Sequence, residues 1–191
     1  MVQKFEFQKL DLEGAYLIKT FCDSDNRGDF IKDYNTEIFN ENGITHELKE
    51  TFYAYSQKGV IRGIHFQLYK QQAKLVRCIN GKIYDVIVDL RPQSSTFGQW
   101  RGFFLTGDNM LELLIPKYFG HGYLTLEDSI VSYKCSEVFY KDGDSGIIWN
   151  DNDIAVNWPL EMLEEKNHLI ISNKDKKLMS FVDYKKLQNY K

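Results

Sequence analysis

Basic residues of three kinds gather in two short segments of this chain. His65 and Arg62 lie in GVIRGIHFQ (59–67), and Lys74 and Arg77 follow close behind it. Arginines can bind a diphosphate through forked, charge-assisted hydrogen bonds, and a lysine can hold an oxygen on which negative charge develops. The sequence therefore offers His65 as a base beside an anion-binding surface, although a solvated basic rim would show the same residue types.

Histidines are scarce among the 191 residues, which narrows the metal chemistry open to the chain. The four are His46, His65, His121 and His168. A metal site in a small β-barrel commonly takes two imidazoles one residue apart on a strand, and no pair has that spacing. The cysteines, Cys22, Cys78 and Cys135, form no CxxC motif, so we expect reduced thiols and no metal.

The composition limits the class of protein. A net charge of −3 argues against a non-specific nucleic-acid surface, and no apolar run approaches the ~20 residues of a membrane span or forms a signal peptide. We therefore expect a cytoplasmic protein with no nucleic-acid or membrane partner. Aromatic residues make up 15% of the chain, which favours strands and surfaces for ligand stacking. No linker or repeat divides the chain, which predicts one domain over residues 1–191.

Short segments of alternating polarity, separated by turn signals, fill the middle of the chain. This pattern predicts an all-β fold, either a sandwich or a barrel of antiparallel strands. Asn80-Gly81 predicts a tight hairpin between strands at 74–79 and 82–90. Further strands are expected at 60–67, 100–106, 111–115, 122–126 and 130–139. Short helices are expected toward the chain ends, at 33–40 and 175–190.

The segment GVIRGIHFQ resembles the signature of the dTDP-4-dehydrorhamnose 3,5-epimerase family. Other segments agree with the family pattern in the same order along the chain. They are DNRGDF (25–30), KLVR (74–77), NG (80–81), DVIVD (85–89), STFGQW (95–100), IP (115–116), GHG (120–122), YK (133–134), the run from 148 to 159, and ISNKD (171–175). The resemblance thus extends over most of the chain.

The resemblance implies a cupin-type jelly-roll barrel that inverts C3, C5 or both of a nucleotide-linked 4-keto sugar through an enolate, without a cofactor. Such a reaction needs a base that reaches the C–H, a donor for the enolate oxygen and an acid across the ring. By motif position, His65 resembles the base, Asp175 the carboxylate paired with it, and Lys74 the enolate-stabilising lysine. Without the resemblance, Asp175 would be interpreted as a helix N-cap.

The same resemblance implies a homodimer whose subunits share their active sites. Arg62 resembles a diphosphate contact, and the segment from Arg27 to Phe30 is expected to reach the neighbouring subunit's site. Further substrate-lining residues are Gln67, His121, Cys135 and Phe139. A regular strand would put Arg62 and His65 on opposite faces, so we predict a bulge or kink at Gly63.

One position departs from the family pattern. Tyr133, Cys135 and Phe139 are expected to share a strand face that the family turns toward the substrate. At Phe139 most relatives carry the tyrosine taken as the general acid, and a phenyl ring has no proton to give. Either Tyr140 acts after a register shift, or Tyr133, Cys135 or a water protonates the carbon, or one of the two centres is not inverted.

A second departure concerns Glu50 and Phe52, which stand where relatives commonly carry a glutamine and an asparagine. A carboxylate at 50 would repel a nearby diphosphate, which leaves open a different nucleotide sugar such as a 4-keto heptose. The leading hypothesis is an epimerase of a nucleotide-activated 4-keto-6-deoxy sugar, in deoxysugar and surface-polysaccharide biosynthesis. The alternatives are a C3-only epimerase, a sugar-nucleotide 3,4-ketoisomerase, and a sugar-nucleotide binding protein without catalysis.

Overall fold

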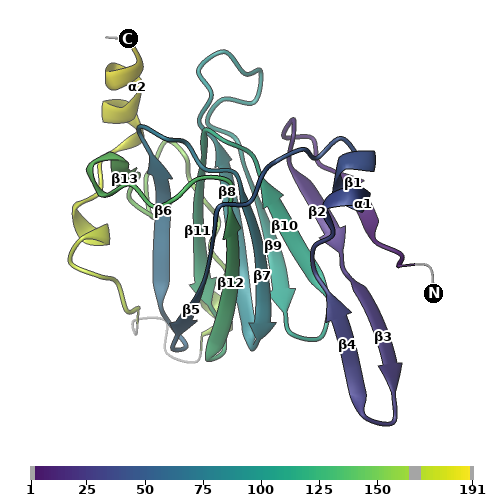
Figure 1. Ribbon diagram of the computed structural model, residues 1–191. Coiled ribbons are helices and arrows are strands. Elements are labelled where there is room, and N and C mark those ends of the chain that lie inside the picture. The colour runs from purple at the N-terminus through teal and green to yellow at the C-terminus, as the bar shows by residue number, and fades with distance from the viewer. Residues whose placement is uncertain (1–2, 164–168, 190–191) are drawn as a thin grey trace.

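Two antiparallel sheets face each other in the computed structural model, which describes residues 3–163 and 169–189 (Figure 1). The six-stranded sheet contains, in spatial order, β1 (Glu6–Lys9), β2 (Tyr16–Lys19), β10 (Leu111–Ile115), β7 (Lys74–Asn80), β12 (Ser129–Cys135) and β5 (Glu50–Ser56). The five-stranded sheet contains β13 (Asp144–Gly146), β6 (Ile61–Gln67), β11 (Phe119–Thr125), β8 (Lys82–Asp89) and β9 (Trp100–Thr106). The expectation of an all-β fold of antiparallel strands is confirmed.

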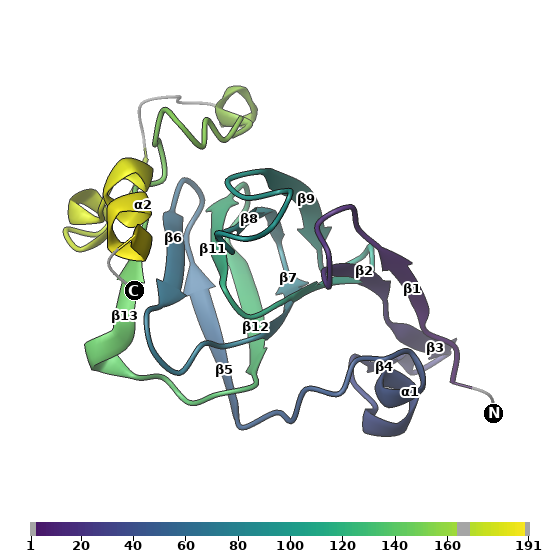
Figure 2. The same cartoon turned by 90° about the horizontal axis from the view of Figure 1, so that it is seen from above.

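Smaller elements surround the two sheets. A hairpin of β3 (Phe21–Asp25) and β4 (Gly28–Lys32) extends away from the body (Figure 1). The helices α1 (Thr36–Glu41) and α2 (Phe181–Asn189) lie on opposite sides of the barrel (Figure 2). Single 3₁₀ turns occur at Lys141–Gly143, Leu160–Met162 and Asp175–Lys177. No helix among the described residues is long and apolar enough to cross a membrane.

Alternation along β8 shows how the sequence forms the interior. Ile83 and Ile87 point between the sheets, where they pack in one fully buried cluster with Val76 of β7. Val86 faces the other way and is covered by the C-terminal segment, including Trp158. Each such buried aliphatic side chain stabilises the fold by about 1.5–3 kcal/mol relative to exposure, so the alternating pattern holds the two sheets together and the C-terminal segment against them.

The turn at Asn80-Gly81 does not close a hairpin, contrary to our prediction. β7 belongs to the six-stranded sheet and β8 to the five-stranded sheet, so the turn carries the chain from one sheet to the other. A type I′ turn needs positive φ at both positions and a type II′ turn at the first, whereas here only the second residue, Gly81, has it, at 81°. Glycine is still required here, because a Cβ would lie 2.2 Å from the carbonyl oxygen of Asp128.

Several predicted element boundaries were wrong, each for a local reason. The first helix begins at Thr36 rather than 33, because the side chain of Asn35 caps it by accepting from two backbone N–H groups. The predicted helix at 175–190 is a 3₁₀ turn followed by α2, which begins after Ser180, whose Oγ accepts from the N–H of Asp183. The strand predicted at 130–139 ends at Cys135, and the strands before residue 57 were missed.

The predicted bulge at Gly63 is confirmed. His65 pairs with His121 of β11, whereas Arg62 pairs with Tyr123, so β6 carries one extra residue between the two pairs. Gly63 has φ of 113°, and a Cβ there would lie 2.6 Å from the Cα of Gly122. The bulge brings Arg62 and His65 to the same face of β6, which a regular strand would not do.

Candidate active site

A cavity of about 540 Å³ lies between the two sheets and is open on one side. The six-stranded sheet lines it with Glu50, Phe52, Ala54, Lys74 and Tyr133, and the five-stranded sheet with Arg62, His65, Phe66, Gln67, His121 and Tyr123. Gly122 of β11, Asp144 of β13 and the loop residues Gln72, Phe139 and Lys174 complete the lining. The wall therefore combines a titratable base, cations, carboxylates and phenols in one enclosed space.

His65 is held by a carboxylate from a distant part of the chain. Its Nε2 lies 3.2 Å from Oδ2 of Asp175, and the same oxygen accepts from the N–H of Gly63 at 3.2 Å. Burial raises the pKa of Asp175, but the hydrogen bonds of His65, Gly63 and Ser172 outweigh it and hold that pKa below its ordinary value. Nδ1 of His65 is buried with no hydrogen-bond partner among the described residues. The ring of His65 lines the cavity and is oriented by Asp175, so the imidazole is placed to act as a general base.

Lys74 enters the cavity from β7 with no hydrogen bond or ion pair to any residue in the described part of the chain. Burial lowers the pKa of its ammonium, and the charges of Cys135, Asp85 and Asp144 oppose that shift only in part. A desolvated cation without a protein partner is suited to hold an oxygen that becomes negative.

A second histidine–carboxylate pair lies in the wall of the cavity, in register with the first. Nε2 of His121 is 2.9 Å from Oδ2 of Asp85, and both residues are buried. His121 of β11 pairs directly with His65 of the neighbouring strand β6. The sequence placed His121 at the site but missed Asp85, although a carboxylate between the inward-facing Ile83 and Ile87 of β8 was the available signal.

Tyr133 faces the cavity from β12, the strand opposite His65. Its ring stacks on Phe52 with centroids 4.7 Å apart and lies edge-on to His121 at 5.7 Å. Burial raises the pKa of its phenol well above the ordinary value, so Tyr133 carries its proton at neutral pH. The cavity therefore has a candidate base on one sheet and a candidate acid on the other.

A family model described as dTDP-4-dehydrorhamnose 3,5-epimerase matches residues 9–183. The chain belongs to this family. A protein of that name from Methanothermobacter thermautotrophicus is 47% identical over 174 residues, which cover 91% of this chain and 92% of the relative. The family consists of carbohydrate epimerases, so the expected enzyme class is confirmed together with the resemblance.

Solved structures agree with this assignment. The dTDP-4-dehydrorhamnose 3,5-epimerase of Bacillus anthracis, crystallised with TDP and PPi, superposes with a TM-score of 0.86 at 40% identity, covering 93% of this chain and 99% of that one. A Legionella pneumophila 3,5-epimerase in complex with dTDP-4-keto-L-rhamnose gives 0.88 at 32% identity, covering 94% of each chain. The expected cupin-type jelly roll is thereby confirmed.

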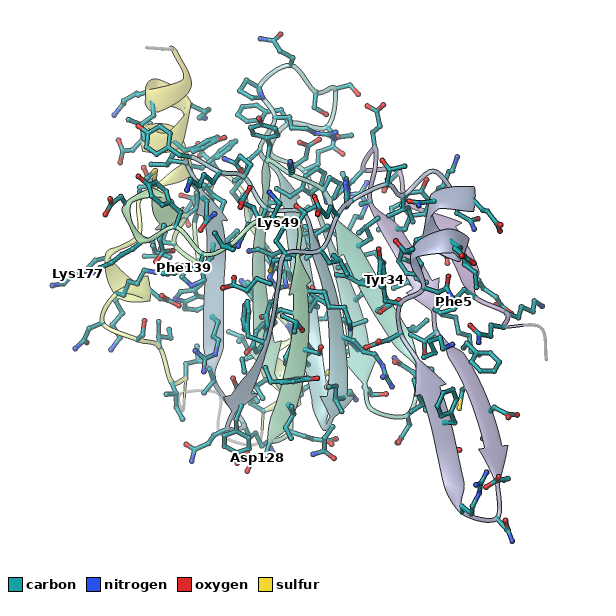
Figure 3. All side chains as sticks on the ribbon, viewed as in Figure 1. Phe5, Tyr34, Lys49, Asp128, Phe139 and Lys177 are labelled. Carbon is teal, nitrogen blue, oxygen red and sulfur yellow. The ribbon has the colours of Figure 1, made fainter. Side chains whose placement is uncertain are left out.

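Residues after β12 depart from the family-based expectation. Because the strand ends at Cys135, Phe139 is not on a strand face; it lies on the following loop, where its N–H donates to Oε2 of Glu50 at 3.0 Å and its ring lines the cavity (Figure 3). The ring of Tyr140 lies under the ammonium of Lys70, 4.6 Å from it, and does not line the cavity. Cys135 is fully buried in the cluster between the sheets and does not line the cavity, and burial raises the pKa of its thiol to about 11.

Gln67 lines the cavity, but both ends of its amide bind backbone. Its Nε2 donates to the carbonyl of Lys70 at 2.7 Å, and its Oε1 accepts from the N–H of Tyr140 at 2.7 Å. Gln67 therefore holds two loops at the rim of the cavity.

Two arginines and one phenylalanine that the sequence placed near the substrate do not line the cavity of this subunit. Arg77 is on the opposite face of β7 from Lys74, buried across from Glu112 of β10, because residues three apart on a strand point to opposite sides. Arg27 and Phe30 are on the exposed β3–β4 hairpin, far outside the cavity lining. The cavity wall does contain another cation, Lys174, which forms a salt bridge with Asp144 and was not predicted from the sequence.

No group of three or more His, Cys, Asp or Glu side chains is arranged to hold a metal ion within residues 3–163 and 169–189; His168 lies outside these ranges.

Proposed function

We propose that this chain inverts C3 and C5 of a dTDP-linked 4-keto-6-deoxy sugar by proton removal and return through an enolate. The supporting observation is the placement of His65 and Tyr133 on opposing sheets across one cavity. Inversion needs a base and an acid on opposite faces of the sugar ring, and this arrangement provides them. The relatives with dTDP-sugar ligands support the choice of substrate.

The steps follow from the free groups in the cavity. The imidazole of His65 takes the proton from the carbon next to the C4 ketone, and the charge of Asp175 stabilises the imidazolium. The electron pair of the broken C–H bond moves to the ketone oxygen, where the ammonium of Lys74 stabilises the enolate. Tyr133 then gives its phenolic proton to the same carbon from the opposite face. Each centre thus loses one proton to His65 and gains one from Tyr133. Exchange with solvent removes the proton from His65 and returns one to Tyr133 before the second centre is inverted.

Tyr133 supplies the hydroxyl that Phe139 lacks. Of the alternatives raised by the sequence, Tyr133 has its ring in the cavity wall, whereas Tyr140 and Cys135 do not line the cavity. The substitution at 139 therefore leaves an acid in place, and both centres remain open to inversion.

The diphosphate is proposed to lie along the cationic side of the cavity, near Arg62 and Lys174. The carboxylate of Glu50 accepts a hydrogen bond from the N–H of Phe139, which orients it within the wall. The rings of Phe52 and Phe139 offer apolar faces for the sugar or the base. The TDP and dTDP-4-keto-L-rhamnose bound in the solved relatives support dTDP as the nucleotide.

A second copy of the chain is proposed to complete the site. The side chain of Arg27 is 85% exposed at the tip of the β3–β4 hairpin, and Phe30 is 61% exposed on β4. An exposed arginine and phenylalanine on a projecting arm fit a role in binding nucleotide at a partner's cavity within a homodimer. We also place the enzyme in the cytoplasm, in line with its three free cysteines, and treat the chain as one domain.

The test is incubation with dTDP-4-keto-6-deoxyglucose in heavy water, with solvent deuterium followed by NMR. We expect deuterium at both C3 and C5 of an inverted product. Deuterium at C3 alone would identify a C3 epimerase, and a carbonyl resonance that leaves C4 would identify a ketoisomerase. Label at neither carbon would refute the proposal for this substrate.

A further inference from the structure

Ser56, the last residue of β5, contacts two residues that line the cavity. Nε of Arg62 donates to Oγ of Ser56 at 3.0 Å, and the hydroxyl of Tyr123 lies 2.9 Å from the same oxygen. Nη2 of Arg62 also donates to the backbone carbonyl of Tyr55, at 3.2 Å. Ser56 and Tyr123 are 2% and 1% exposed, whereas Arg62 is exposed. A cation at the surface of the cavity is thus held by buried groups.

The strand order brings these side chains together. Arg62 of β6 pairs directly with Tyr123 of β11, so both side chains leave the same face of the five-stranded sheet. β5 is an edge strand of the six-stranded sheet, where the backbone carbonyls on the outer side have no neighbouring strand. Arg62 therefore binds β5 from the opposite sheet, through both the backbone of Tyr55 and the side chain of Ser56, and joins the two sheets at this point.

The two hydrogen bonds to β5 determine which edge of the Arg62 guanidinium is left for a ligand. An arginine has five N–H donors in a planar fork, and Nε and Nη2 donate along one of its edges. β5 occupies that edge. The adjacent edge, formed by Nη1 and Nη2, retains two parallel N–H groups, which is the geometry of a bidentate bond to phosphate.

We propose that Ser56 is a positioning residue, which holds Arg62 so that its Nη1–Nη2 edge meets the diphosphate of the nucleotide sugar. The inference rests on the proposed role of Arg62 as a diphosphate contact. Oγ of Ser56 accepts from Arg62 and shares its second lone pair or its own proton with Tyr123, so Tyr123 in turn fixes Ser56. Holding the long arginine side chain in place before binding lowers the entropy that binding costs. Ser56 should therefore act on nucleotide affinity and not on proton transfer.

The test is a double-mutant cycle with dTDP as the ligand, measured by isothermal titration calorimetry. The proteins compared are wild type, Ser56→Ala, Arg62→Ala and the double variant. Values of kcat and KM with dTDP-4-keto-6-deoxyglucose are measured beside the affinities. Ser132→Ala is the matched control, because this serine is also 2% exposed but lies on the outward face of β12, between Val131 and Tyr133, which point between the sheets.

We expect Ser56→Ala to weaken dTDP binding by about threefold to tenfold and to raise KM by a similar factor, with kcat within about twofold of wild type. The same substitution should have no further effect in the Arg62→Ala background, because the cation that Ser56 positions is then absent. Tyr123→Phe should show a smaller loss of affinity that also disappears without Arg62. Ser132→Ala should bind dTDP as wild type does.

Wild-type affinity in Ser56→Ala would overturn the inference. A loss of the same size with and without Arg62 would also overturn it, because such a loss would indicate a distortion of β5. If Ser56→Ala fails to fold, the cycle of Tyr123→Phe with Arg62→Ala decides by the same comparison. Wild-type affinity in Arg62→Ala would instead refute the proposed diphosphate contact, and a wild-type protein that does not bind dTDP would refute the proposed nucleotide; the inference falls with either.

Discussion

Oδ2 of Asp175 lies 3.2 Å from Nε2 of His65, although 110 residues separate the two in the chain. The contact forms because the bulge at Gly63 presents its N–H to the same oxygen, so one carboxylate fixes both the ring and the strand irregularity that aims it. Asp175 itself lies 4% exposed in a 3₁₀ turn outside the five-stranded sheet. Its charge is therefore directed at the imidazole and not at solvent.

Asp175→Asn should lower kcat by roughly 100-fold or more with little change in KM, because the amide still accepts from Gly63 but no longer stabilises an imidazolium. Deuterium entry at C3 and C5, followed by NMR in heavy water, should fall with kcat, since removal of the proton is the step affected. Asp153→Asn, which removes an exposed carboxylate paired with Lys185, should retain wild-type rates. Wild-type exchange in Asp175→Asn would show that His65 works without its carboxylate.

Tyr133→Phe and Tyr140→Phe should differ sharply. Tyr133→Phe should reduce inversion by roughly 100-fold or more, because the hydroxyl of Tyr123, the other phenol in the wall, is hydrogen-bonded to Ser56. Deuterium should still enter recovered substrate through His65. Tyr140→Phe should stay within about twofold of wild type, since the ring packs under Lys70 outside the cavity. Product stereochemistry and label are read together by NMR. The reverse result would make Tyr140 the acid and require the loop after β12 to move.

Side-chain orientations that depend on strand alternation were predicted well from the sequence. Lys74 and Tyr133 face the cavity because each shares its strand's inward face with apolar residues that the pattern already marks as core. The bulge at Gly63 was predictable for the same reason, because a regular strand could not place Arg62 and His65 together. Alternation is a local property, so local sequence carries it.

The sequence did not predict which strands pair with one another, or which residues of different strands come into contact. The Asn80-Gly81 signal marks a change of direction but does not say which sheet receives the next strand, and here the chain changed sheets. Asp85 and His121 are 36 residues apart and meet because β8 and β11 are neighbours, which no local pattern specifies. Phe139 was assigned to a strand face because the alternation continued in sequence past the point where pairing ends at Cys135.

Acid should weaken the fold through Asp89. Burial raises the pKa of this carboxyl, but hydrogen bonds from Arg91, Ser94 and Thr96 outweigh it and lower the pKa to about 2, from an ordinary value of 3.8. Because the pKa is lower in the folded state, the ionised carboxyl stabilises the fold at pH values above 3.8, its ordinary pKa, and this stabilisation is lost as the pH falls toward 2. A pKa shift of this size corresponds to about 2 kcal/mol in the free energy of unfolding.

The check on Asp89 is the free energy of unfolding in urea for wild type and Asp89→Asn, measured from pH 5 to pH 2. The advantage of the wild type should shrink by about 2 kcal/mol over this interval, because protonation removes the charge that the substitution also removes. An advantage that stays constant down to pH 2 would mean that the hydrogen bonds to Asp89 do not depend on its charge.

The proposed sharing of sites between subunits predicts that two inactive variants restore each other. Arg27→Ala should weaken nucleotide binding only at the partner's cavity, and His65→Asn should abolish proton removal only in its own. When the two chains are co-expressed, half of the dimers are mixed, and each mixed dimer has one site with both lesions and one site with neither. Activity should therefore return to about a quarter of wild type at subsaturating substrate, although each variant alone is far below that. If Arg27 acted within its own subunit, every site of the mixed dimer would carry one lesion, and mixing would restore nothing.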